Sequence, residues 1–80
     1  MRLDKYLKVS RIIKRRTVAN DACDANRISV NGKPARASYE VKVGDILEVN
    51  LGQRPIKAQV EAVNEYSLKE SAHLMYKIID

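Results

Sequence analysis

The sequence predicts an α+β fold, in which two N-terminal helices pack on a small, mostly antiparallel β-sheet. Two observations support this prediction. Apolar residues recur at helical spacing near the start of the chain, and from residue 28 onward they alternate with polar residues at the period of a half-buried strand. The 80 residues give room for one small domain, so a single domain is expected over 1–80.

A first helix is predicted over residues 3–9. Three apolar residues recur there at the i, i+3, i+4 spacing of one helix face, namely Leu3, Tyr6 and Leu7. Basic residues fall on the opposite arc, at Arg2, Lys5 and Lys8. Ser10 is expected to end this helix, and Ile12 and Ile13 are expected to anchor the short connection that follows.

A second helix is predicted from Thr17, taken as its N-terminal cap, to about Ala25. Small residues would form its inner face and let another element approach closely; they are Val18, Ala19, Ala22 and Cys23. Asn26 suits the left-handed position at which a helix stops.

A β-hairpin is predicted next. Ile28 and Val30 alternate with polar neighbours, and Asn31-Gly32 is a strong signal for a two-residue hairpin turn. Pro34 cannot donate to a neighbouring strand, so the returning segment should lie at a sheet edge or in a loop.

Three later strands complete the expected sheet. One covers residues 46–49 after a Gly44-Asp45 turn, and another covers 56–60 after a turn at 52–55. The last apolar run, 74–79, is interpreted as a closing strand, with a final helical turn as the alternative.

The positive charge is concentrated at the N-terminus. Residues 1–16 carry seven basic residues and one acidic residue, a net +6, whereas the other 64 residues carry eight basic and nine acidic residues, a net −1. This asymmetry indicates a polyanionic partner, either nucleic acid or an anionic membrane surface. The apolar face of the first helix is too narrow for an interfacial membrane helix, which favours nucleic acid.

Catalysis is not expected. His73 is the only histidine and Cys23 the only cysteine, so no metal site, cofactor or disulfide is predicted, and Cys23 is interpreted as a buried, inert thiol. The three glycines are isolated turn residues and form no phosphate-binding loop. Without a signal peptide or a membrane span in the sequence, the expected location is the cytoplasm.

The basic residues suit recognition of folded RNA by shape and backbone. Lys14, Arg15 and Arg16 cluster at the start of the second helix, where Arg16 and Thr17 would combine side-chain donors with the positive end of the helix dipole. Lys33 in the hairpin, together with Asn31, Arg27 and Arg36, could extend this surface along one edge. Tyr6 is expected in the core and Tyr39 as an exposed aromatic residue.

Four motifs resemble the RNA-binding domain named after ribosomal small-subunit protein S-four. They are R-L-D-x-x-L at 2–7, R-T-x-A at 16–19, R-I-x-V-N-G at 27–32 and V-x-x-G-D at 41–45. The resemblance implies such a module over about residues 1–50, followed by a C-terminal strand extension over about 51–80. Among proteins with this module, the chain resembles the stand-alone RqcP and heat-shock-protein-fifteen family. It ends without the basic extension of the enterobacterial members, which favours the RqcP branch.

This resemblance implies a non-catalytic role in ribosome-associated quality control. The protein would bind large ribosomal subunits that hold peptidyl-tRNA, contact the tRNA and rRNA, and work with RqcH as it adds alanine to stalled chains; a monomer is expected. Motif position makes six residues candidates for the RNA surface: Arg2, Asp4, Lys5, Lys8, Arg11 and Arg16. Asp4 would orient neighbouring arginines, or else serve only as an acid favoured by the helix dipole. The alternatives are a general rRNA or tRNA chaperone or recycling factor, and a protein-interaction module that uses the acidic sheet half.

Overall fold

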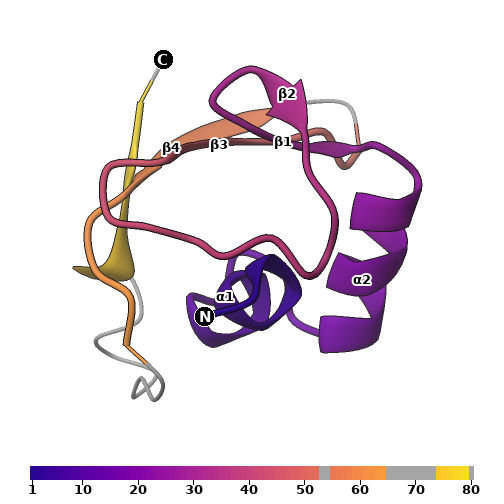
Figure 1. Ribbon diagram of the computed structural model, residues 1–80, viewed down its shortest axis with the longest axis horizontal. Coiled ribbons are helices and arrows are strands. Elements are labelled where there is room, and N and C mark those ends of the chain that lie inside the picture. Colours follow the sequence, from indigo (N-terminus) through magenta and orange to yellow (C-terminus); the bar gives the residue numbers. More distant parts are fainter. Residues whose placement is uncertain (53–54, 65–73, 80) are drawn as a thin grey trace.

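The computed structural model describes residues 1–52, 55–64 and 74–79, and it has the predicted α+β architecture (Figure 1). Helices α1 (Leu3–Val9) and α2 (Arg16–Asp24) precede a five-stranded sheet in the order β2-β1-β3-β4-β5. The strands are β1 (Ile28–Val30), β2 (Lys33–Pro34), β3 (Ile46–Val49), β4 (Ile56–Val60) and β5 (Tyr76–Ile78). Every pairing is antiparallel, and Pro34 lies on an edge strand as expected.

The first helix has the predicted bounds, and Ser10 is its C-terminal cap residue. The predicted N-terminal cap of the second helix, Thr17, is wrong by two residues, because Arg15 is the cap residue. Arg15 has an extended backbone and accepts the first helical hydrogen bond, from the Ala19 N–H at 3.1 Å. Thr17 is therefore inside the first turn of α2 and does not cap it.

The C-terminus of α2 follows the prediction. Asn26 is left-handed, with φ of 59°. Its N–H donates to the Cys23 carbonyl at 3.0 Å, and the Arg27 N–H donates to the Ala22 carbonyl at 2.9 Å. These two bonds satisfy carbonyl groups that the helix end would otherwise leave unpaired.

The inner face of α2 is narrower than predicted. Ala19, Ala22 and Cys23 are buried, but Val18 is 42% exposed. Each helical residue turns the side-chain direction by about 100°, which places Val18 to one side of the stripe formed by the other three. The prediction that Val18 belongs to the inner face of this helix is therefore wrong.

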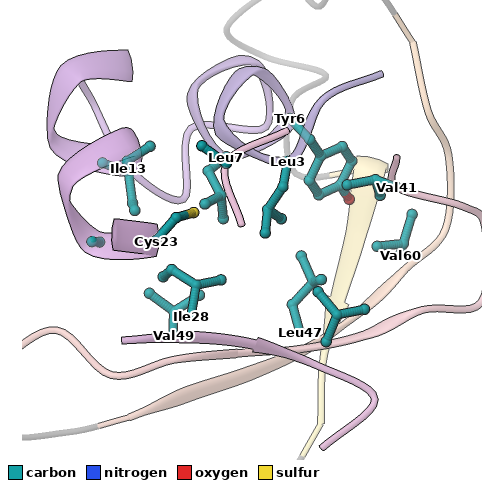
Figure 2. Close-up of a cluster of buried hydrophobic side chains, with 14 of the residues drawn as sticks. Leu3, Tyr6, Leu7, Ile13, Cys23, Ile28, Val41, Leu47, Val49 and Val60 are labelled. Carbon is teal, nitrogen blue, oxygen red and sulfur yellow. The ribbon is translucent and has the colours of Figure 1, made fainter. Parts of the chain in front are cut away.

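The core lies between the helices and the sheet (Figure 2). Leu3, Tyr6 and Leu7 of α1 are fully buried, as their spacing predicts. The Tyr6 hydroxyl donates to the Met75 carbonyl at 2.6 Å, which ties α1 to the segment before β5, and burial raises the pKa of Tyr6. Tyr39, expected to be exposed, is half-buried against this core.

The buried aspartate Asp45 fixes the hairpin. Asn31 and Gly32 both have positive φ, as a two-residue hairpin turn requires. The Asn31 side chain accepts from the Ile46 N–H at 2.9 Å and donates to Asp45 at 3.1 Å. Asp45 also accepts from the Tyr39 hydroxyl at 2.9 Å. Asp45 thus joins the turn to the segment between β2 and β3.

The C-terminal part forms strand β5, so the strand interpretation of 74–79 is confirmed over Tyr76–Ile78. His73 and part of the predicted 52–55 turn are outside the described residues. Across the described ranges, neither helix has the length and apolar character needed to cross a membrane.

Candidate RNA-binding site

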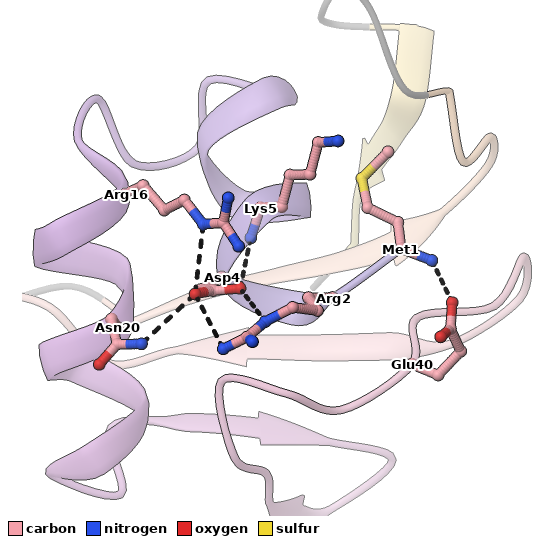
Figure 3. Close-up of polar contacts among 7 residues, drawn as sticks. All are labelled: Met1, Arg2, Asp4, Lys5, Arg16, Asn20 and Glu40. Atoms are coloured by element: carbon pink, nitrogen blue, oxygen red, sulfur yellow. Dashed lines mark hydrogen bonds and ion pairs between the residues drawn. The ribbon is translucent and has the colours of Figure 1, made fainter.

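The N-terminal site is organised around Asp4, whose side chain is only 3% exposed (Figure 3). It accepts hydrogen bonds from Arg2 Nε at 3.2 Å and from the Lys5 backbone N–H at 2.8 Å. From α2, Arg16 Nε and Asn20 Nδ2 each donate to it at 3.3 Å. One carboxylate therefore links the start of α1 to the first two turns of α2.

These contacts keep Asp4 ionised. Burial by itself raises the pKa of a carboxyl group, but the hydrogen bonds from Asn20, Arg16, the Lys5 N–H and Arg2 outweigh it, so the net effect is a lowered pKa. The orienting role expected for Asp4 therefore has a geometric basis. Its position in the first turn of α1 also agrees with the alternative interpretation as a dipole-favoured acid.

Asp4 leaves both arginines able to bind a further anion. The side chains of Arg2 and Arg16 are 51% and 48% exposed. Asp4 engages Arg16 through Nε, so the two outer nitrogens of that guanidinium can still donate. Two guanidinium groups share one carboxylate, which leaves a net positive charge at a fixed place.

The two helix starts differ in what they can offer an anion. The Leu3 and Asp4 N–H groups at the start of α1 donate to the carbonyls of Tyr39 and Ala37. At the start of α2, the N–H groups of Arg16, Thr17 and Val18 have no acceptor within the described residues. The start of α2, beside Arg16, is therefore the end with N–H groups available to donate to an anion.

Four further predicted residues supply exposed charge next to this cluster. They are Lys8, Arg11, Lys14 and Arg15. Within the part of the chain that the structure describes, none of the four forms an ion pair. Arg11 is left-handed, with φ of 64°, directly after α1. Together with Arg2, Lys5 and Arg16, these four residues form what we call the basic head.

The two remaining predicted site residues, Thr17 and Lys33, lie in different places: Thr17 is beside the Asp4 cluster and Lys33 is away from it. Thr17 is exposed and lines an open hollow of about 320 Å³ with Asp4 and Arg16. Lys33 is on edge strand β2 and lines a separate hollow together with Arg36. Lys33 is therefore not part of the Asp4 cluster.

Asn20 was missed by the sequence analysis, although it contacts Asp4 directly. The four-residue spacing between Arg16 and Asn20 could have identified it. Asn20 follows Arg16 by four residues, so both side chains lie on one face of α2 and can reach the same carboxylate.

Comparison with known proteins identifies the family. The S4 domain family matches residues 1–47. The RQC P-site tRNA stabilizing factor of Bacillus subtilis is 52% identical over 79 residues, which cover 99% of this chain and 92% of that protein. The factor of the same name from Streptococcus pneumoniae is 51% identical over 79 residues, covering 99% and 90%.

A solved structure supports the fold. The trimeric structure of Vibrio cholerae Heat Shock Protein 15 matches with a TM-score of 0.92 and 24% identity, over 99% of this chain and 81% of that one. Because the matched relatives are about half identical over nearly their whole length, and because the S4 domain family covers more than half of the chain, the protein belongs to the S4-domain family and, within it, to the RqcP and heat-shock-protein-fifteen family.

Proposed function

We propose that this protein is a non-catalytic RNA-binding factor of ribosome-associated quality control that stabilises tRNA in the P site. The observation that carries the proposal is the pair of arginines held by buried Asp4 at the junction of α1 and α2. The relatives from Bacillus subtilis and Streptococcus pneumoniae are both named RQC P-site tRNA stabilizing factor, which supports the same assignment.

The basic head binds phosphates by position and by charge. Arg2 and Arg16 are held by Asp4 before RNA arrives, so binding costs less side-chain entropy than it would for free arginines. A guanidinium can donate two parallel hydrogen bonds to one phosphate. The exposed Lys8, Lys14 and Arg15 add electrostatic attraction that does not depend on RNA sequence.

A more specific proposal names the complex in which the basic head binds RNA. The RNA is peptidyl-tRNA together with rRNA of the large ribosomal subunit, and the protein acts while RqcH adds alanine to the stalled chain. The protein contributes no chemical step; it holds the tRNA in place between cycles. Ribosomes work in the cytoplasm, so the protein is active there.

Co-sedimentation with large ribosomal subunits, with and without peptidyl-tRNA, tests this function. We expect peptidyl-tRNA to increase the bound fraction and salt to release the protein, since each neutralised phosphate adds about 0.7–0.9 to the salt slope. Replacing exposed head residues that do not touch Asp4, as in Lys14→Ala/Arg15→Ala, should weaken binding and lower that slope by about 1.4–1.8.

A matched control removes the same charge elsewhere. Lys57 and Lys77 are exposed on β4 and β5, the two strands farthest from β2 in the sheet. The variant Lys57→Ala/Lys77→Ala should bind like the wild type. If it weakened binding while the head variant did not, the contact would be through the sheet and the proposal would be wrong. Equal binding with and without peptidyl-tRNA would instead favour a general RNA chaperone.

A further inference from the structure

The hairpin face contains a hollow that the basic head does not explain. It is open, has a volume of about 590 Å³, and is bordered by β2 and the segment that follows it. This volume is in the range of small-molecule binding sites. Its lining includes the apolar Val30, Pro34 and Ala35.

Two cations and one aromatic residue also line this hollow. Lys33 and Arg36 are exposed, and neither forms an ion pair with any residue that the structure describes. Of the described residues that line the hollow, none is acidic. Tyr39 is the aromatic residue, and its hydroxyl is held by Asp45 at 2.9 Å. Because Asp45 also accepts from the Lys42 N–H at 3.0 Å, the Tyr39 side chain is anchored to a fixed loop.

The hollow is connected to the basic head. Arg36 and Ser38 line it and also line a second hollow of about 410 Å³, which includes Arg2 and Asn20. Asn20 in turn lines the hollow beside Asp4. A line of adjoining hollows therefore runs from the start of α2 past Arg2 and Arg36 to Lys33.

We propose that the hairpin hollow binds an unpaired nucleotide of RNA, with its base against Tyr39 and the apolar lining and its phosphates at Lys33 and Arg36. A base offers an uncharged, flat surface and its backbone offers negative charge, which matches the two kinds of lining. The hollow extends the basic head, which is expected to bind paired RNA through its backbone. The inference deepens the proposed function and rests on it in one respect, that RNA is the ligand.

Binding of two RNA probes tests the inference. One probe is a blunt duplex, and the other is the same duplex with a short single-stranded extension that carries the fluorescent base 2-aminopurine. Stacking of one base on an aromatic side chain corresponds to a gain of about five- to 150-fold in affinity. The wild-type protein should therefore prefer the extended probe by a factor in this range, and binding should quench its fluorescence.

Variants assign the effect to the hollow. Lys33→Ala/Arg36→Ala should weaken binding of the extended probe more than that of the duplex, and should lower its salt slope by about 1.4. Tyr39→Leu should abolish quenching, whereas Tyr39→Phe, which keeps the ring but loses the hydrogen bond to Asp45, should retain it. Lys57→Ala/Lys77→Ala removes the same charge from the far side of the sheet and should change neither probe.

Each outcome decides a separate question. Equal affinity of the wild type for both probes, or quenching that survives Tyr39→Leu, would overturn the inference. If the extended probe is preferred but the protein does not associate with ribosomal subunits, the proposed function is wrong and the nucleotide site remains. If subunit binding depends on the basic head but the single-stranded extension adds no affinity, the proposed function stands and the nucleotide site is wrong.

Discussion

Replacing Asp4 by asparagine separates the effect of charge from the effect of geometry at the basic head. The substitution removes one negative charge, so the net charge of the chain rises from +5 to about +6. If charge alone determined RNA binding, Asp4→Asn would bind more tightly. If Asp4 acts by orienting Arg2 and Arg16, the variant should bind more weakly despite its higher charge.

The cost in stability follows from the contacts. The Asp4 Oδ2 atom accepts from Arg16 and Asn20, both at 3.3 Å. An asparagine can keep its carbonyl oxygen on the Lys5 N–H, but its amide nitrogen then faces these two donors. Two hydrogen bonds to a charged group give about 3 kcal/mol, and the half-exposed Arg16 guanidinium reduces this to about 2 kcal/mol.

Urea unfolding measures this loss. The free energy of unfolding of a small domain falls by about 1–2 kcal/mol per molar urea, so the urea concentration at the unfolding midpoint should fall by about 1–2 M. Asp24→Asn, which changes an exposed carboxylate of α2, is the matched control and should leave the midpoint almost unchanged. RNA affinity is measured below the unfolding transition of both variants. Unchanged stability together with equal or tighter RNA binding would show that Asp4 does not organise the site.

Three further outcomes are expected. The pKa values of Asp4 and Asp45 are lowered in the folded state, because the hydrogen bonds that the two carboxylates accept outweigh the effect of burial. The stability that these groups contribute is therefore complete above the ordinary pKa of 3.8 and should be lost as the pH falls below it. Acid unfolding followed by circular dichroism measures this loss. Arg11→Gly should leave stability equal or raise it by up to about 1 kcal/mol, because glycine adopts the left-handed conformation without strain, yet it should weaken RNA binding through the lost charge. Cys23, 2% exposed and with its pKa raised to about 11 by burial, should react with thiol reagents only after unfolding, as mass spectrometry of native and urea-treated protein can establish.

Most of the fold was predictable because each element has a local signal. The spacing of Leu3, Tyr6 and Leu7 determines the buried face of α1, and the Asn31-Gly32 pair determines the hairpin turn. The errors fall where the signal was weak. Thr17 is a good capping residue, but the backbone at Arg15 already accepts the first helical bond, so the helix begins earlier.

The candidate site was predictable in its charges and not in its arrangement. Sequence shows that Arg2 and Arg16 are basic, but only the packing of α1 against α2 brings both to one carboxylate. The half-buried position of Tyr39 depends in the same way on contacts across the fold. Its partner Asp45 is six residues away, and periodicity along a single element could not identify that bond.

The contacts of Asp4 should couple the stability of the N-terminal half to the RNA binding that we propose for the basic head. Seven basic residues within the first 16 repel one another, and a domain of this size has only a thin core to offset that repulsion. An exposed acid would lower the repulsion but would also leave Arg2 free to move. Asp4 is buried where α1 meets α2, so it offsets charge and fixes both helices with the same oxygen atoms. A substitution that loosens the helix pair should therefore also reduce the affinity for RNA.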